Sequence, residues 1–375
     1  MRIALISFDF AEYCIRLANA LGRKLEIALL LPDMHAEPHL PILDSAVKFQ
    51  PFRKPRLRQV LQQVGMVSSL IKSVERFDPD VVHVQQGYMW FNFGLPWLQR
   101  YPLVMTVHDP RHHIGDKSSQ KTPQLIMDFG FHRADQIIVH AKEMRKILIE
   151  GCHISSQRVH VIPHIKIGHD LAYGQQQEEE ECLILFFGRI WEYKGLEYLI
   201  RAEPLITSRV PKARIVIAGQ GEDFDRYRRM MVHPESFIVY NEYISDGALS
   251  DLFRRAAVVV LPYIEATQSG VIPLAYTFRK PVVATTGGGL PEMVEHGRTG
   301  YLVPPRKPLV LAKAIVRLLK DKQLRRQFGM NGHRKIDTEC SPDAVAEKTL
   351  RVYYQTLADL NRAENCTVTR ATGWQ

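Results

Sequence analysis

The sequence has no apolar run of the roughly 18 residues that a membrane-spanning helix requires. Its first residues carry one basic side chain and only a short apolar run before Asp9, so the hydrophobic core of a signal peptide is also missing. We therefore interpret the N-terminal residues as the first β-strand of a folded domain and predict a cytoplasmic protein.

Cysteines are few, and no two of them form a CxxC pair. The five are Cys14, Cys152, Cys182, Cys340 and Cys366. This scattered, odd-numbered set predicts no disulfide framework and fits a reducing compartment. His112 and His113 are adjacent, but neither has a cysteine or carboxylate at metal-ligand spacing. No metal and no cofactor are expected.

A strong charge of one sign is missing as well. Lysine and arginine number 49 against 40 acidic residues, and the net charge of +9 is shared almost evenly by the two halves of the chain. Without a basic face interleaved with aromatic residues, we predict no nucleic-acid partner. The first strand is not followed by a GxGxxG sequence, which argues against a dinucleotide-dependent oxidoreductase.

Short β-rich runs alternate with helical patterns along the 375 residues, and the rhythm starts twice. This alternation predicts an α/β protein with two doubly wound, parallel-sheet halves, whose ligands bind beyond the carboxyl ends of the strands in a cleft between the halves. The predicted strands are 3–6, 25–31, 81–84, 103–107, 136–139 and 159–162 in the first half, and 183–187, 213–218, 236–240, 258–261 and 281–285 in the second.

The two halves are predicted to be separate domains, 1–170 and 171–340. The polar run Gln175–Glu181 lies near the boundary and has no apolar periodicity, so we interpret it as an exposed linker; a surface loop inside one large domain is the alternative. Residues 341–375 are predicted to form a C-terminal helix over 343–360, with Ser341 as its N-cap and a frayed tail from Glu364.

Two cations follow the first strand of the second half. Gly188 allows a tight exit from the strand, and Arg189 and Lys194 come next in the loop. An arginine fork and a lysine point charge at a strand end could hold a diphosphate. Two solvated surface cations are the alternative.

Three glycine-containing loops follow other strands of the second half. Gln268, Ser269, Gly270 and Val271 lead into a predicted helix, whose free N–H groups would attract an anion. Glu292 lies early in a helix after a triple-glycine loop. A carboxylate at this position also stabilises a helix through its dipole, so a structural role is the alternative. Gly219 and Gly221 end a strand, and alone they indicate only a turn.

Two histidines end strands of the first half. His108 follows the strand 103–107 and precedes Asp109-Pro110, so we expect it at the edge of the cleft as a polar contact. His164 follows the strand 159–162, and we expect it too to make a polar contact at the edge of the cleft.

Taken in order, these sequences resemble family 4 (group 1) retaining glycosyltransferases of GT-B fold. The resemblance is strong in the second half and weak in the first. It rests on Phe187-Gly188-Arg189 with Lys194-Gly195, Ile217 to Gly221, Leu261-Pro262-Tyr263, Lys280 to Thr285, Gly288 to Glu292 with Gly297, Gly300 to Val303, and, in the first half, Pro79 to His83 and His108-Asp109.

The resemblance implies that the second half binds a UDP-, GDP- or ADP-sugar and the first half a glycan or lipid-linked acceptor, in bacterial surface polysaccharide or glycolipid synthesis. It makes Arg189 and Lys194 the diphosphate clamps, Gln268 to Val271 the loop that touches the donor, and His108 the histidine near the reacting sugar. It also implies front-face displacement without an enzyme nucleophile, and a last helix that crosses back to the first domain.

This chain departs from the family pattern at two carboxylates. The position expected for the ribose-binding glutamate holds Leu274, and its partner position holds Ala266, one residue after Glu265. A leucine cannot accept hydrogen bonds from a ribose. The glycine pair that many members carry after their first strand is also missing.

Two alternatives remain open from the sequence. A non-catalytic protein of the same fold would explain Leu274, whereas a nucleotide-sugar epimerase would need cleft carboxylates that we do not find. The basic cluster Arg53, Lys54, Arg56 and Arg58 predicts either a solvated loop or peripheral contact with the inner face of the plasma membrane.

Overall fold

The computed structural model describes residues 1–116, 121–168, 178–221 and 223–372, with side chains as far as Leu360. The chain divides into two compact units. Unit 1 comprises Met1–Arg111, Gln120–Ile165 and Ser341–Gln375, and unit 2 comprises His112–Ser119 and Lys166–Cys340. Short stretches of chain thus pass from one unit to the other between β5 and α5 and before α14.

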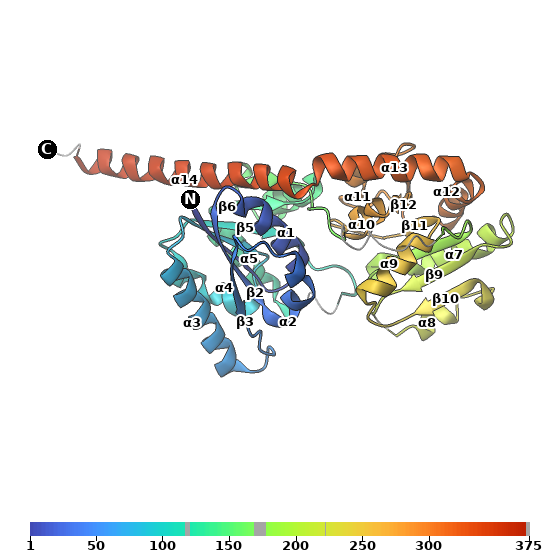
Figure 1. Cartoon of the computed structure of the whole chain (residues 1–375), viewed down its shortest axis with the longest axis horizontal. Coiled ribbons are helices and arrows are strands. Elements are labelled where there is room, and N and C mark those ends of the chain that lie inside the picture. The colour runs from blue at the N-terminus through green and yellow to red at the C-terminus, as the bar shows by residue number, and fades with distance from the viewer. Residues whose placement is uncertain (117–120, 169–177, 222, 373–375) are drawn as a thin grey trace. The chain divides into compact units, whose positions relative to one another are not determined.

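Unit 1 is a seven-stranded parallel sheet in the order β3-β2-β1-β4-β5-β6-β7 (Figure 1). Its strands are β1 (Arg2–Ser7), β2 (Glu26–Pro32), β3 (Lys48–Phe52), β4 (Val81–Gln85), β5 (Leu103–Val107), β6 (Gln136–Val139) and β7 (Val159–Val161). Its helices are α1 (Ala11–Gly22), α2 (Asp33–Ala36), α3 (Val60–Phe77), α4 (Met89–Gly94), α5 (Gln124–Arg133), α6 (Lys142–Lys146) and α14 (Pro342–Thr372).

Unit 2 repeats the design with six parallel strands in the order β10-β9-β8-β11-β12-β13. The strands are β8 (Leu183–Phe187), β9 (Arg214–Ala218), β10 (Phe237–Tyr240), β11 (Val258–Leu261), β12 (Val282–Thr285) and β13 (Gly300–Val303). The helices are α7 (Leu196–Thr207), α8 (Asp225–Arg228), α9 (Asp246–Arg255), α10 (Val271–Thr277), α11 (Leu290–Met293), α12 (Pro308–Lys320) and α13 (Lys322–Glu339).

The predicted fold class is confirmed, and the eleven predicted strands are present within about one residue at each end. Strands β4, β5 and β11 are buried along their whole length, as expected where helices cover both faces of a parallel sheet. The sequence analysis missed β3 and β13. Both are edge strands. β3 contains Pro51 and is only partly buried, whereas β13 is largely buried but begins with Gly300, a residue that is rare inside strands.

The described end of the polar run, Glu178 to Glu181, is largely exposed, and ion pairs hold it on unit 2. Glu179 accepts hydrogen bonds from Nε and Nη2 of Arg325 at 3.1 and 2.9 Å. The Arg325 side chain is only 1% exposed, and a buried guanidinium needs such a counter-ion. Glu180 and Glu181 pair with Arg255 and Lys322. Gln175 to Gln177 lie outside the described residues.

The C-terminal helix α14 packs against α1 and β5 of unit 1 (Figure 1). Ser341 caps it, since its Oγ accepts a hydrogen bond from the N–H of Ala344 at 3.2 Å. The helix continues to Thr372, beyond the end that the sequence predicted. In the core, Tyr353 Oη lies 2.6 Å from Nδ1 of His83, and both residues are fully buried.

Removing the Tyr353 hydroxyl tests how firmly α14 is held on unit 1. We expect Tyr353→Phe to lower the free energy of unfolding by about 1–3 kcal/mol, because Nδ1 of His83 loses its partner inside the protein. Tyr354→Phe is the matched control, since Tyr354 is 57% exposed and should be neutral. Urea unfolding of both variants measures the difference; equal stabilities would contradict the assigned bond.

Candidate functional site

The site predicted in the second half lies at the carboxyl edge of the unit 2 sheet. Strand order places β8 beside β11, with β9 on one side of them and β12 on the other. The chain leaves β8 in one direction and β11 in the other, so this is the point where a doubly wound sheet opens a crevice for ligands. Loops that follow all four strands meet there.

These loops pack backbone against backbone. The N–H of Ile264 donates to the carbonyl of Tyr193 at 2.8 Å, which joins the loops after β11 and β8. Gly195 has φ +63°, and a Cβ there would overlap with the carbonyl oxygen of Pro262. Gly288 has φ +52°, and a Cβ would overlap with the carbonyl of Ala266. Only glycine fits both positions, which hold the β8, β11 and β12 loops together.

Gly219 and Gly221 extend this assembly to β9. The N–H of Ile190 donates to the carbonyl of Gln220 at 3.1 Å. A Cβ on either glycine would overlap with the carbonyl oxygen of Gly188 or Ile190. The two glycines therefore allow the loop that carries Arg189 to approach closely. This close packing explains the GxG sequence at the end of β9.

Arg189 is half exposed and already has two protein partners. Its Nη1 lies 3.2 Å from Oδ2 of Asp116, and its Nη2 lies 3.3 Å from the hydroxyl of Tyr193. The Asp116 side chain is only 1% exposed. A guanidinium is a planar fork, so these two contacts on different nitrogens help to fix its orientation.

Lys194 lies on two aromatic rings. Its Nζ is 3.9 Å from the ring centroid of Tyr263 and 4.8 Å from that of Tyr193. The faces of aromatic rings carry partial negative charge and attract an ammonium group. The two cations predicted for a diphosphate thus both contact Tyr193 of their own loop, and Lys194 also contacts Tyr263 of the β11 loop.

The loop before α10 is arranged differently from the prediction. The N–H of Val271 donates to Oγ of Ser269 at 3.3 Å. The sequence predicted that this N–H would be free. Ser269 is buried, and its Oγ also lies 3.4 Å from the hydroxyl of Tyr263. A serine two residues before the helix satisfies its first amide, as serines at helix starts commonly do. Gly270 packs near Ile167.

Two buried polar atoms of these loops have no hydrogen-bond partner among the described residues. They are Oε1 of Gln268, after β11, and Nε1 of Trp191, after β8. Buried polar groups are nearly always satisfied, and those that are not call for an explanation such as a missing ligand. Gln268 was predicted as a donor contact. Trp191 was not among the predicted site residues.

Leu274 and Glu265 are both committed to other contacts. Leu274 is 5% exposed and belongs to the hydrophobic core beneath the loops, where it packs on Gly168. Oε1 of Glu265 accepts a hydrogen bond from the N–H of Ile114 at 2.8 Å and lies 3.4 Å from Nδ1 of His113. Glu292 is exposed in the first turn of the short helix α11.

The sequence analysis did not predict the position of His112 to Asp116, here called the 112–116 segment. These residues lie in the first half of the sequence but belong to unit 2. The His113 ring stacks on Tyr193 with centroids 4.4 Å apart, and its Nε2 lies 3.3 Å from Oγ1 of Thr267. With the Asp116 contact to Arg189, the segment touches the loops after β8 and β11. The only local signal was the turn-forming Gly115, with φ +75°.

His108 is fully buried in unit 1, which corrects its predicted place at an open edge. Nε2 lies 3.0 Å from Oε1 of Gln85 and Nδ1 3.2 Å from Nε2 of His140, while Phe10 stacks on the ring at 3.8 Å. Burial, reinforced by the neighbouring imidazoles, holds the pKa of His108 well below its ordinary value. The ring is neutral at pH 7. His164 is buried beside it, and burial lowers its pKa too.

The basic cluster is divided. Arg53, Arg56 and Arg58 are exposed, whereas the Lys54 side chain is 23% exposed and binds Asp9 at 3.1 Å. Among the described residues, no helix is long and apolar enough to cross a membrane. The described part of the chain also contains no group of three or more histidine, cysteine or acidic side chains placed to hold a metal ion.

Family models match both parts of the chain. Residues 11–165 match Glycosyltransferase Family 4, and residues 181–321 match Glycosyl transferases group 1. An uncharacterized glycosyltransferase of Methanocaldococcus jannaschii is 33% identical over 305 residues, which cover 76% of each chain. The protein is a family 4 (group 1) glycosyltransferase. A D-inositol 3-phosphate glycosyltransferase of Pseudarthrobacter chlorophenolicus is 33% identical over 300 residues, 71% of this chain and 70% of that one.

Solved structures show that this glycosyltransferase has the GT-B fold. Sucrose-phosphate synthase of Thermosynechococcus elongatus superimposes with a TM-score of 0.73 at 19% identity, over 96% of this chain and all of that one. HepE of Anabaena in complex with UDP gives a TM-score of 0.70 at 16% identity, over 95% and 100% of the two chains. Nothing in these comparisons favours a non-catalytic protein or an epimerase.

The packing of the loops after β11 and β12 can be tested at Gly288. We expect Gly288→Ala to lower the free energy of unfolding by more than about 1 kcal/mol, because the left-handed backbone and the Ala266 carbonyl leave no room for a methyl group. Gly247→Ala is the control: it lies in α9 with nothing near its Cα, and alanine should stabilise that helix by up to about 1 kcal/mol. Denaturant unfolding that ranks the two variants the other way would refute the packing.

Proposed function

We propose that this protein transfers a sugar, with retention of configuration, from a nucleotide-diphosphate sugar held by unit 2 to a hydroxyl group of an acceptor. The observation that carries the proposal is the pair Arg189 and Lys194, two cations oriented by tyrosines at the β8–β11 edge. The unpaired Nε1 of Trp191 and Oε1 of Gln268 in the same loops support a ligand there.

UDP is the nucleotide to test first. The Anabaena HepE structures contain UDP, UDP with glucose, and UDP-glucose, and they share this fold at 16–17% identity. The ribose must be held without a carboxylate at position 274, since Leu274 is part of the core. Glu292 and the amide of Gln268 are polar candidates from the β12 and β11 loops.

The chemistry requires stabilisation of negative charge on the leaving diphosphate. The bond between the anomeric carbon and the phosphate oxygen breaks, the bond to the acceptor oxygen forms on the same face, and the acceptor proton passes to the departing phosphate. Arg189 and Lys194 offset the growing charge, and because both are already oriented they need little reorganisation. His108, neutral and fully hydrogen-bonded, is assigned no proton transfer; its role is to support the acceptor side of unit 1.

Among biological roles, we favour surface glycan or glycolipid synthesis. The relatives include D-inositol 3-phosphate glycosyltransferases and a sulfoquinovosyl transferase of Arabidopsis thaliana, 23% identical over 299 residues. Their names print a small polar acceptor, D-inositol 3-phosphate, and a transferred sulfoquinovosyl group. A lipid-linked acceptor for this protein would require contact with a membrane surface.

An exposed apolar face of unit 1 supports that contact. It consists of Val60, Leu61 and Val64 on α3 with Phe93 and Trp97 on and after α4, all more than half exposed. The exposed Arg53, Arg56 and Arg58 precede α3, and Nε1 of Trp90 on α4 donates to the carbonyl of Leu57. Apolar side chains beside basic ones match the interface of an anionic bilayer.

Substitution of the two cations tests the enzymatic assignment. We expect Arg189→Ala and Lys194→Ala each to lower kcat by about 10²–10³, the usual cost of removing one contact to developing charge. The experiment starts with thermal-shift screening against UDP, GDP and ADP and then measures turnover of the matching nucleotide sugar. Arg228→Ala and Lys320→Ala, exposed cations elsewhere in unit 2, are the controls. Turnover of both test variants near that of wild type would refute the assignment.

Vesicle co-sedimentation tests the membrane face. Each exposed arginine should contribute about 1 kcal/mol on an anionic surface, so a triple Arg53, Arg56, Arg58→Ala variant should bind about 100-fold more weakly. Leu61→Ser should weaken binding without changing its salt dependence. The triple variant Lys313, Lys320, Lys322→Ala in unit 2 is matched in charge. Wild-type binding that does not depend on anionic lipid would contradict the proposal.

A further inference from the structure

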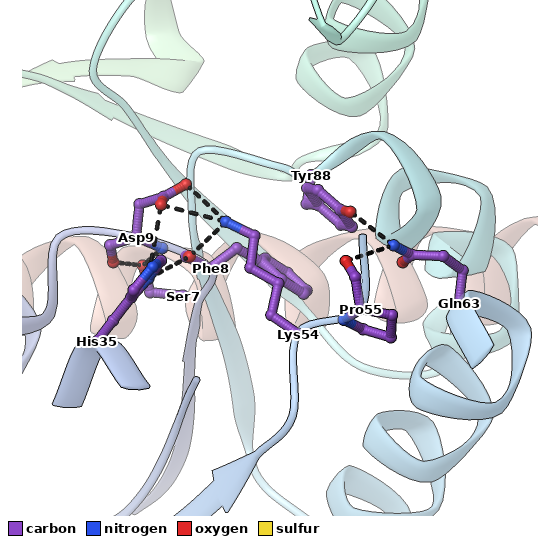
Figure 2. A network of polar contacts seen from close by, with 8 residues as sticks. All are labelled: Ser7, Phe8, Asp9, His35, Lys54, Pro55, Gln63 and Tyr88. Carbon is purple, nitrogen blue, oxygen red and sulfur yellow. Dashed lines mark hydrogen bonds and ion pairs between the residues drawn. The ribbon is translucent and has the colours of Figure 1, made fainter. Parts of the chain in front are cut away.

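A second polar network lies at the carboxyl edge of the unit 1 sheet, and neither the donor site nor the membrane face uses it. Figure 2 shows its side chains around the ammonium group of Lys54. They come from the ends of four neighbouring strands: Asp9 follows β1, His35 lies in α2 after β2, Lys54 follows β3, and Tyr88 follows β4. Strand order reverses between β1 and β4, so this edge is the ligand crevice of unit 1.

Asp9 is an exposed carboxylate in a fixed position. Nζ of Lys54 donates to both of its oxygens, at 3.1 and 3.2 Å, and to the carbonyl of Phe8 at 2.8 Å. Nδ1 of His35 lies 3.1 Å from the same carbonyl and 3.6 Å from Oδ1 of Asp9. The Asp9 side chain nevertheless remains 59% exposed, against 23% for Lys54. The charge presented outward is therefore that of the carboxylate.

Lys54 is itself held by the loop that carries it. Gln63 of α3 is fully buried and donates from Nε2 to the carbonyl of Pro55 at 2.9 Å and to the hydroxyl of Tyr88 at 2.8 Å (Figure 2). The Tyr88 ring stacks on Phe8 with centroids 4.8 Å apart. The network thus links the ends of β1, β3 and β4, and an exposed salt bridge alone would not need this support.

Phe10, next to Asp9, has an unusual backbone. Its φ is +58° and ψ +39°, a left-handed conformation that bulky residues rarely adopt. The residue stacks on the buried His108 ring, with an interplanar angle of 16°, and remains 40% exposed. Strained backbone that the surrounding structure maintains is concentrated at functional sites. Here it holds an aromatic ring beside a fixed carboxylate.

We propose that Asp9 and Phe10 form the subsite for a neutral, hydroxyl-bearing ring of the acceptor. The proposal rests on the transferase function above and specifies its acceptor. A carboxylate accepts hydrogen bonds from two neighbouring hydroxyl groups, and an aromatic ring packs against the C–H face of a sugar or cyclitol. An exposed carboxylate repels phosphate, so a phosphorylated ring is excluded from this subsite.

Direct binding to the full-length protein tests the subsite. The probes are methyl α-D-glucopyranoside, methyl α-D-mannopyranoside and myo-inositol, each compared with its phosphorylated counterpart by saturation-transfer NMR titration. We expect wild type to bind at least one neutral probe at millimolar concentration and at least tenfold more tightly than its phosphate. Asp9→Asn should weaken the neutral probe about tenfold or more and abolish the preference over phosphate. Phe10→Asn, which tolerates the left-handed backbone, should also weaken it.

Glu75→Gln and Phe129→Asn, exposed residues elsewhere in unit 1, are the controls and should bind as wild type does. Thermal unfolding verifies that every variant is folded. Tighter binding of the phosphates, no binding of any neutral probe, or unchanged binding by folded Asp9→Asn would each overturn the subsite. Failure of the proposed function is separate: wild type that binds a neutral probe but shows no thermal shift with UDP, GDP or ADP contradicts the donor assignment and supports the subsite.

Discussion

The carboxyl edge of the unit 2 sheet depends on close backbone packing among the loops that follow its strands. Gly195 and Gly288 let the loops after β8, β11 and β12 touch carbonyl against Cα. Side chains that must meet a ligand can then come from three strands and still be held rigidly. Tyr193 illustrates the result, since it lies in one loop, bonds to the next through its carbonyl, and contacts both Arg189 and Lys194. The same glycines are what made the family recognisable from the sequence.

The fold was largely predictable because the inner strands of a parallel sheet covered on both faces appear in the sequence as short apolar runs. Strands such as β5 and β11 are short, mostly apolar and buried along their whole length. Edge strands β3 and β13 are harder to identify, since β3 contains a proline and is only partly buried and β13 begins with a glycine. The end of α14 was missed for a related reason: its last turns lack the apolar periodicity by which helices are identified.

The site was predictable only where its residues share a motif. Arg189 and Lys194 occupy one loop, where their spacing predicts a diphosphate contact; Asp116, which pairs with Arg189, is 73 residues away and carries no local signal. Glu265 was noticed as a carboxylate one position out of register, and its contact with the N–H of Ile114 explains why it stands there. His108 was placed correctly along the chain, but its burial depends on Phe10, Gln85 and His140, whose proximity only the folded sheet determines.

In both units a more buried charged side chain orients an exposed one of opposite charge. In unit 2, a half-exposed guanidinium is oriented by a buried carboxylate; in unit 1, an exposed carboxylate is oriented by a mostly buried ammonium group. In each case the partner lowers the freedom of the exposed charge without covering it. A cation suits a diphosphate, and a carboxylate suits hydroxyl groups while it repels phosphate. The two crevices therefore differ in sign at the group that meets solvent, and under the two proposals this difference disfavours an anionic donor at Asp9.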